Sequence, residues 1–343
     1  MRNFIMHDII NMQQLRASVF STLEEAAQFV ENVDLTLWQD RINSDYDNFD
    51  QVARPYMWPK DWFMSQIDYK RVYYGQPHNF AIGDLALSTG RGGDGRFIRA
   101  ASMNNNKPEL YEVDTGEVIN WSDFMQIQNI TSNKNLGVIL MSALFNKMFV
   151  DDARIGFCGK HAGGVTDPKA NPNGEDVAPG WHEIARQESG GAQIISDAVT
   201  IGAGGDFSGV DEAALHLINN KIPAAYRNDP RLVVLVGYEM AARERLRLFN
   251  TASGASNIEA AGAWGSTVAG KFAFIPPFMP GNRLCVTTLG NLRINIAAGT
   301  FKPEFVMDDK MKCFRSSALR YQGYGLTDVN LYAAFDESAV TYK

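Results

Sequence analysis

Residues 121–159 constrain the fold more than any other part of this 343-residue chain. The Ser122 hydroxyl can cap a helix start, and Asp123 follows it where the helix dipole favours a negative charge. Apolar residues then recur at spacings of three, four or their sums, namely Phe124, Ile127, Leu136, Leu140, Met141, Leu144, Phe145, Met148 and Phe149. The pattern predicts a helix of about 30 residues, roughly 45 Å long. Because globular helices average about 11 to 12 residues, we expect something extended to lie along it.

Composition limits the class of protein. The chain is 45% hydrophobic and 21% charged, which is enough to bury a substantial core and favours two lobes over one. No uninterrupted apolar run approaches the ~18 residues of a membrane span, and residues 1–14 lack the pattern of a signal peptide. We therefore expect a protein that is made and kept in a cytoplasm, with no membrane partner.

Charge and cysteine usage narrow the choice further. A net charge of −7 argues against tight, sequence-independent binding to a phosphate backbone, which needs a basic surface. Cys158, Cys285 and Cys313 stand apart from one another without a CxxC pair. We expect them to be buried thiols in a reducing compartment, and we expect no metal knuckle.

Residues 1 to about 60 have the pattern of an arm. Ser21 and Glu24 form a capping box that opens a short helix through Val33. The following segment contains aromatic residues without a sustained period, and two prolines prevent a long helix. Two interpretations stay open, an irregular segment packed on its own domain and an arm lying across a neighbouring subunit. In the second, the expected inter-subunit contacts include Trp38, Tyr56 and Trp58.

Residues 67–118 read as strands around a glycine-rich tip. Residues 68–74, 79–87 and 111–119 carry β-favouring side chains, which predicts a long hairpin or flap. The sequence GRGGDG at 90–95 does not open a helix, which argues against a phosphate-binding loop and favours an exposed tip. The charged residues of this tip that we expect to pair with another surface are Arg91, Asp94, Arg96 and Arg99.

After the long helix comes a loop rich in Gly, Pro and Asn that we expect to connect two lobes. The GKHAGG sequence at 159–164 lacks the residue order of a Walker A motif. Trp181 begins a short helix with the sequence WHEIAR, in which Arg186 stands where a zincin motif has its second His. We expect a surface helix there.

Residues 193–250 form the most regular block. Ser208 and Asp211 cap a helix whose apolar face comprises Val210, Ala213, Ala214, Leu217 and Ile218. The apolar run at 231–237 predicts a strand covered on both faces, and residues 238–250 predict a helix. The block therefore predicts an α/β lobe with a small sheet. A strand followed by Gly237 and a helix is also the pattern of a ligand-binding crevice.

The last third returns to strands. Pro276, Pro277 and Pro280 indicate edge or turn positions between them. Alternation of side chains at 331–335 predicts a strand that pairs near the long helix and closes a lobe. The five histidines fall in no nucleophile context, so we predict no catalytic residue, no cofactor and no metal. Pairs of carboxylates are left open, because any two of 39 acidic residues can meet in space.

The order of these elements resembles the HK97-type fold of tailed-phage major capsid proteins, and its P2-like branch in particular. The residues that carry the resemblance are IGFCG at 155–159, DVAPGWHEIARQE at 176–188, the unbroken run from GAGGDFSG to VVLVG at 202–237, and PPFMPGNRLCVTTLGNLRINI at 276–296. The resemblance covers roughly residues 79–335. We can match no counterpart for the arm before residue 79. The resemblance therefore does not extend to the trimming that P2-like relatives undergo there.

The resemblance implies an α+β capsid fold with five parts. These are an N-terminal arm and lead-in at 1–74, an extended β-hairpin loop at 75–118, a peripheral domain with a spine helix at 119–180, an α/β axial domain at 181–299, and a return to the peripheral domain at 300–343. It implies a subunit that self-assembles as hexamers and pentamers into an icosahedral shell around double-stranded DNA. It also implies a scaffolding protein and a portal as partners, assembly in the host bacterial cytoplasm, and a final place in the virion capsid.

The physical pattern agrees with a shell-forming subunit. An arm and a flap that cannot bury their apolar residues alone are stabilised by adjacent copies, and such heterologous contacts build rings and shells. An acidic wall suits a container that must hold DNA without sticking to it. The alternative from another class is a cytosolic α/β enzyme with a ligand crevice near Gly237. A third, weaker reading is a decoration or tail protein.

Overall fold

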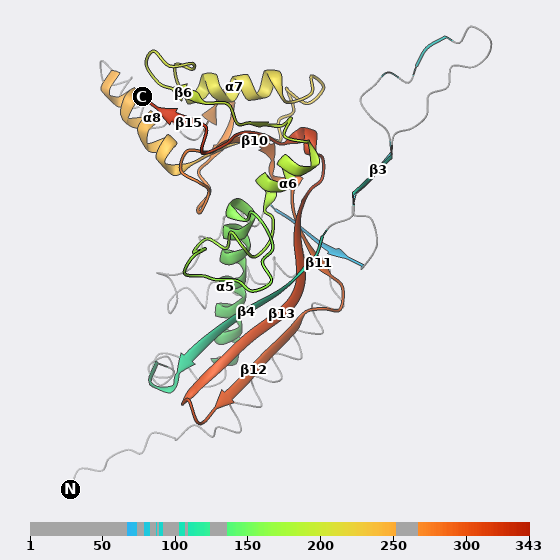
Figure 1. The fold of residues 1–343 in the computed structure, drawn as a ribbon, viewed down its shortest axis with the longest axis vertical. Coiled ribbons are helices and arrows are strands. Elements are labelled where there is room, and N and C mark those ends of the chain that lie inside the picture. Colours follow the sequence, from blue (N-terminus) through green and yellow to red (C-terminus); the bar gives the residue numbers. More distant parts are fainter. Residues whose placement is uncertain are drawn as a thin grey trace.

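The computed structural model describes residues 67–73, 79–82, 87, 89–91, 103–106, 109–123, 136–251 and 267–343. They form two lobes, which Figure 1 shows one above the other. The lower lobe has a long helix beside a sheet of long strands, and the upper lobe has a sheet of short strands with helices packed on it. The predicted α+β class and two-lobe organisation are confirmed for these residues. No helix among them has the length and apolar character that crossing a membrane requires.

The lower sheet is built around one long strand. Its members are β1 (Asp68–Val72), β4 (Tyr111–Asn120), β11 (Leu292–Ala297), β12 (Lys302–Asp308) and β13 (Cys313–Leu326). One edge of β13 pairs antiparallel with β4, and its other edge pairs antiparallel with β12 and then with β11. β1 adds parallel to β11. The pairing places residues 111–118, which the resemblance assigns to the extended loop, within this sheet.

The described part of the predicted long helix is α5 (Leu136–Cys158), with 23 residues. It ends at the expected glycine, whose amide donates to the carbonyl of Ile155 at 2.7 Å. The two apolar residues Met148 and Phe149 are buried in the lower core, as their spacing predicts. The cap at Ser122 is wrong, because Trp121 already has helical geometry directly after β4. Residues 124–135 lie outside the described part of the chain.

The upper sheet has six strands. Their order is β5 (Ile194–Ile195), β14 (Ala333–Phe335), β10 (Leu284–Thr288), β7 (Leu232–Val236), β9 (Lys271–Phe274) and β8 (Thr267–Val268). Two helices, α7 (Val210–Asn220) and α8 (Tyr238–Thr251), share a core with one face of this sheet. A parallel pair, β6 (Val199–Ile201) and β15 (Val340–Tyr342), joins the same core. Every residue of β7 is buried, which confirms the strand covered on both faces.

Helix α7 confirms the predicted apolar face but not the predicted cap. All five residues expected on that face are buried, and they pack in the upper core. The N-cap is Gly209, and it makes no side-chain cap. Glu212 stabilises the helix start instead, because its carboxylate accepts from both the backbone amide and the hydroxyl of Ser208 at 2.7 Å. The carboxylate also lies in the first turn, where the helix dipole favours it.

Helix α6 (Trp181–Glu188) begins where the sequence predicts, but it is not a plain surface helix. Trp181, His182 and Ala185 are buried. The indole N–H of Trp181 donates to the carbonyl of Arg293 at 3.0 Å, and its ring packs edge-on against Phe157. Through these two contacts α6 joins α5, which carries Phe157, to β11, which carries Arg293.

Two of the crossings between the lobes contain short 3-10 turns. η4 (Leu289–Asn291) joins β10 to β11, and η5 (Val329–Leu331) lies between β13 and β14. The strand expected to pair near the long helix is β14, and that expectation is wrong because β14 pairs with β10 and β5 of the upper sheet. Asp328 supplies the physical reason. Its carboxylate accepts from the Asn330 amide at 2.9 Å and caps η5, which turns the chain out of the lower sheet.

The predicted hairpin has a described base. β2 (Asn79–Ile82) pairs antiparallel with β3 (Met103–Asn106) and with no other described strand. In Figure 1, β3 lies well to one side of both sheets. The polar run at 103–106 is therefore a strand, and this ribbon reaches away from the body rather than lying on it.

Candidate functional site

The residues predicted to contact neighbouring subunits lie mostly outside the described part of the chain. Arg91 is described and is exposed, without regular secondary structure. The others, Trp38, Tyr56, Trp58, Asp94, Arg96 and Arg99, lie outside the described residues. The structure therefore brings none of the predicted set together, and their contacts stay predictions.

The outer edge of β4 is a second surface suited to another chain. Among the described strands β4 pairs with β13 alone, so its other edge carries a row of backbone N–H and C=O groups. A groove of about 680 Å³ runs between this edge, α5 and the loop at 162–177. A strand edge of this kind is a template for pairing with an extended segment. The open edge of β4 along this groove has the backbone chemistry that such a segment needs.

A buried ion pair fastens the long helix to the lower sheet. Asp152 of α5 and Arg320 of β13 are fully buried, and their charged atoms lie 2.9 Å apart. Arg320 also donates to Thr115 of β4 at 2.8 Å. The Asp152 carboxylate accepts from Gln322 at 2.7 Å, and burial raises the pKa of neighbouring Tyr69 well above its usual value. Three elements are thus tied to one side chain.

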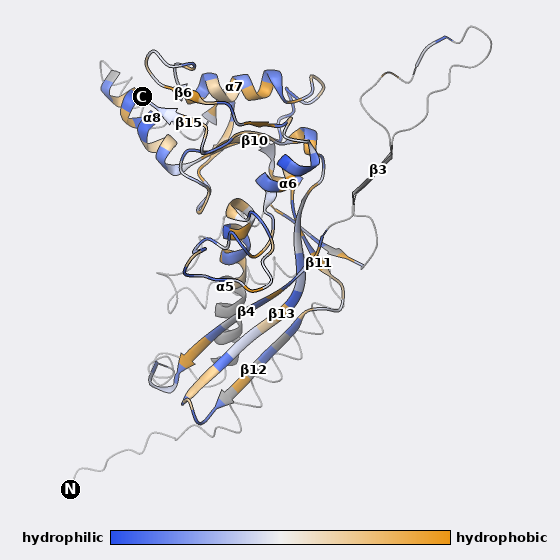
Figure 2. Ribbon diagram, in the orientation of Figure 1, coloured by the Kyte–Doolittle hydropathy of each residue, from blue (hydrophilic) through white to orange (hydrophobic). Residues whose placement is uncertain are grey.

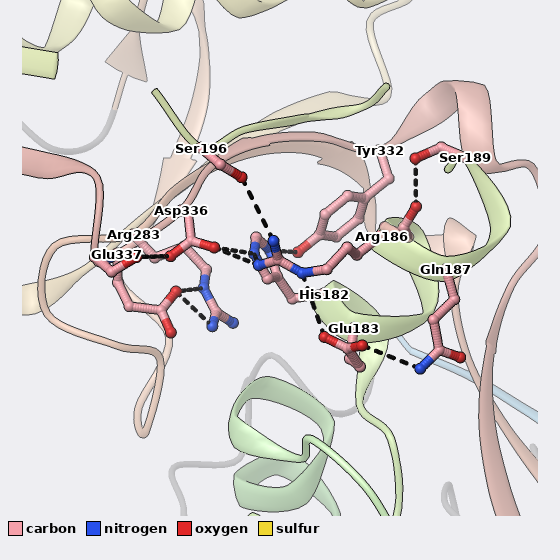
Figure 3. A network of polar contacts seen from close by, with 12 residues as sticks. His182, Glu183, Arg186, Gln187, Ser189, Ser196, Arg283, Tyr332, Asp336 and Glu337 are labelled. Carbon is pink, nitrogen blue, oxygen red and sulfur yellow. Dashed lines mark hydrogen bonds and ion pairs between the residues drawn. The ribbon is translucent and has the colours of Figure 1, made fainter. Parts of the chain in front are cut away.

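A second polar cluster, which we call the junction cluster, lies where α6 meets the upper sheet (Figure 3). Arg186 of α6 donates to the carboxylate of Asp336, which follows β14 directly. Arg283, just before β10, donates to Glu337 at 2.9 Å and to the carbonyl of Phe157 in α5 at 2.6 Å. Buried His182 lies close to Asp336 and Glu337, the two carboxylates that these arginines bind. The cluster therefore links helices of the lower lobe to the C-terminal strands of the upper one.

The charged groups of the junction cluster shift one another's pKa values. His182 and Arg186, with donors from Ser338, hold the pKa of Asp336 well below its usual range. Burial tends to raise the pKa of Glu337, but Arg283 outweighs it and the net shift is downward. Burial lowers the pKa of His182, and the two arginines act in the same direction against the opposing carboxylates. Both Asp336 and Glu337 are therefore held in the charged form by arginines, beside an imidazole that burial keeps neutral.

His182, Asp336 and Glu337 also form a set whose possible metal-ligating atoms lie within 4.8 Å of one another. Each carboxylate in the set already accepts from an arginine, at Arg186 and Arg283. A divalent cation bound there would have to displace a guanidinium from each of these carboxylates. The donor set does not fit a metal, and we interpret the cluster as a structural joint.

The crevice predicted near Gly237 is filled by the chain itself. A Cβ on Gly237 would lie 2.3 Å from the carbonyl oxygens of Pro280 and Gly281, so the backbones are in direct contact. The amide of Met240, in the first turn of α8, donates to Gly281 at 3.0 Å. This helix start is therefore occupied by the protein's own carbonyl groups rather than open to a phosphate. The enzyme alternative loses the geometry on which it rests.

Sequence reasoning missed both charged clusters. Only His182 and Arg186, four residues apart on one helix face, carry a local signal. Arg186 and Asp336 are 150 residues apart along the chain, and Asp152 and Arg320 are 168 residues apart, and such pairing has no local pattern.

The fold defines a class of protein. A chain in the solved procapsid of satellite phage P4, which includes the size determination (Sid) protein, matches this one with a TM-score of 0.72 and 17% identity. The match covers 98% of this chain and 99% of that chain. At this identity the likeness establishes the fold alone, and that fold is the HK97-type fold of a phage capsid subunit.

The family follows from the sequence match. The model of the P2 family of phage major capsid proteins matches residues 36–338, so this chain belongs to that family. The capsid proteins of Escherichia phage P2 are 28% identical over 167 residues. That match covers 45% of this chain and 47% of the relative, so the chain spans about half the length of the curated protein it matches. The resemblance stated from the sequence is confirmed by this family match over residues 36–338.

Proposed function

We propose that this chain assembles as hexamers and pentamers into an icosahedral shell around double-stranded DNA. The observation that carries the proposal is the family match over residues 36–338, together with a hairpin that leaves its own body. Among the described strands the β2–β3 ribbon pairs with neither large sheet, so its outer edges are open to partners from a neighbouring copy. The groove beside β4 supplies a receptive surface of the matching kind.

The proposal assigns a role to each part of the subunit. The lower lobe serves as the peripheral domain, centred on 119–180 and the strands after 300. The upper lobe, within 181–299, serves as the axial domain around the symmetry axes, completed by β14 and β15. The ribbon within 75–118 is the extended loop. We propose that the chain has no catalytic role. We also propose that a scaffolding protein and a portal are its partners, and that it assembles in the host cytoplasm.

Removal of residues 90–106 tests the proposal. Because β3 pairs only with β2 among the described strands, the deletion removes no strand from either large sheet. We expect the thermal unfolding of the unassembled subunit to stay unchanged, while shells disappear from a sedimentation profile. Replacement of the same residues by a Gly/Ser linker of equal length is the matched control for chain connectivity and should fail to assemble as well. A deletion that assembles normally, or one that unfolds the subunit, contradicts the proposal.

A further inference from the structure

Helix α6 is a polar helix at the junction of the two lobes. Figure 2 shows most of it in the hydrophilic colours, between the upper sheet and α5. Two of its polar side chains face the residue after β14, namely His182, which is 6% exposed, and Arg186, which is 36% exposed. They are four residues apart, about one helical turn, so both lie against the same carboxylate of Asp336.

The two ring nitrogens of His182 face different partners (Figure 3). Nε2 lies 3.4 Å from an Nη nitrogen of Arg186, and Nδ1 lies 3.2 Å from the Tyr332 hydroxyl. A guanidinium can only donate, so Nε2 accepts from it, and the ring proton belongs on Nδ1, where it donates to Tyr332. The neutral imidazole is therefore held in one tautomer, by a donor on one side and an acceptor on the other.

The same nitrogen of Arg186 also occupies the oxygen of Asp336 that lies nearest the ring. It donates to Oδ2, and Nε2 of His182 lies 3.8 Å from that oxygen, which is too far for a hydrogen bond. The other oxygen, Oδ1, accepts from the amide and the hydroxyl of Ser338 at 3.0 and 2.7 Å. Arg186 thus fills the lone pair of Nε2 and also holds the oxygen that would stabilise a charged imidazole.

The other charged groups near the ring have partners of their own. Arg283 donates to Glu337 at 2.9 Å and to the Phe157 carbonyl at 2.6 Å. Glu183, on the same helix, has an oxygen 3.3 Å from Nε of Arg186. In the described part of the chain, the ionisable groups that face His182 or Arg186 are Glu183, Arg283, Tyr332, Asp336 and Glu337.

A proton on the ring would set His182 and Arg186 in competition for Asp336. The charged imidazole has two N–H donors, so Nε2 no longer accepts from Arg186, and two donors then face each other at 3.4 Å. The new N–H reaches Oδ2 of Asp336 by an approach of about 1 Å. Arg186 is the partner able to leave, because its side chain is partly exposed and Glu183 offers it a second carboxylate.

We propose that proton uptake by His182 releases Arg186 from Asp336, so that the tie between α6 and the chain after β14 passes from one side chain to the other. The tie moves one helical turn toward the start of α6, and Arg186 also gives up its 3.4 Å bond to Ser196, the residue after β5. One proton thus selects between two arrangements of the junction cluster. Linkage is reciprocal, so a carboxylate from outside the cluster that captures Arg186 also strengthens proton binding at His182.

NMR of the unassembled full chain tests this coupling. Carbon-13 labels at His Cε1 and Arg Cζ report His182 and Arg186 separately as the pH is lowered from 7. Because burial lowers the pKa of His182, the transition is expected below about pH 6.5. Both signals should change with one midpoint. In the control variant His182→Gln, the side-chain oxygen accepts from Arg186 but takes up no proton, so the Arg186 signal should stay constant.

Three results of this titration would overturn the coupling. The first is an Arg186 signal that stays constant while His182 takes up its proton. The second is an Arg186 signal that changes in the same way in His182→Gln, because another group then controls it. The third is an imidazole that stays neutral until the whole chain unfolds.

A second variant measures the size of the effect. Arg186→Met frees Oδ2 of Asp336 for the ring, so the proton affinity of His182 should rise by about tenfold or more. Arg231→Met removes the same charge from an exposed arginine just before β7 and should leave that affinity unchanged. Equal affinities in Arg186→Met and the parent chain sink the inference. The proposed shell function stands in either case, because no step of the switch depends on assembly.

Discussion

The ion pair between Asp152 and Arg320 should decide whether the long helix stays on the lower sheet. Both side chains are fully buried, so replacing either one alone leaves a buried charge without its partner. In Asp152→Asn, the guanidinium of Arg320 keeps its bonds to Thr115 and Gln322 but loses its counterion. Breaking a buried pair from one side costs about 3–5 kcal/mol of the free energy of unfolding. We expect losses of this size in Asp152→Asn and in Arg320→Met.

The double variant separates the pair from its surroundings. Asp152→Asn/Arg320→Met removes both charges, so we expect it to cost about 2–3 kcal/mol less than the sum of the single variants. The assay is urea unfolding of the unassembled subunit, followed by circular dichroism and tryptophan fluorescence to confirm one transition. Single variants that each cost less than about 0.5 kcal/mol, or a double variant that is additive, would refute the reasoning.

Three further outcomes are expected. The pKa of His182 is lowered on folding, so the unfolded chain binds its proton first as pH falls below about 6.5, and stability is lost there at up to about 1.4 kcal/mol per pH unit. His182→Asn should flatten the dependence of urea midpoints on pH between 7 and 5, and an unchanged slope contradicts this. Gly156→Ala should destabilise the fold instead of giving the usual helix gain of about 1 kcal/mol, because its Cβ would lie 2.5 Å from the ring of Trp181; a raised melting temperature would contradict it. Burial raises the pKa of Cys158 to about 11 and of Cys285 to about 12, so mass spectrometry should find both unalkylated at pH 8 until the chain unfolds.

Local patterns predicted the elements whose burial can be read from their own residues. β7 is an unbroken apolar run, and the apolar spacing of α7 matches its buried face at all five positions. The sequence did not reveal β13, the longest of the described strands, because its buried face includes Ser316, Arg320 and Gln322 and the alternation of apolar and polar residues is lost. The polarity of that face makes sense only with Asp152 of α5 in place.

The crossing between lobes was beyond local reasoning for a related reason. A strand at 333–335 is evident from alternation, but its sheet depends on the turn that precedes it. The junction cluster combines residues from α6, the start of β10 and the chain after β14, so it exists only once both lobes are built. Family resemblance supplied the order of the lobes, and the contacts that join them had to come from the structure.

Electron microscopy of the purified full chain tests the central claim most directly. A shell-forming subunit should give closed particles of uniform diameter, with clusters of five and six subunits on their surface, alone or with a scaffolding protein. A chain that stays a monodisperse monomer under all these conditions would contradict the account.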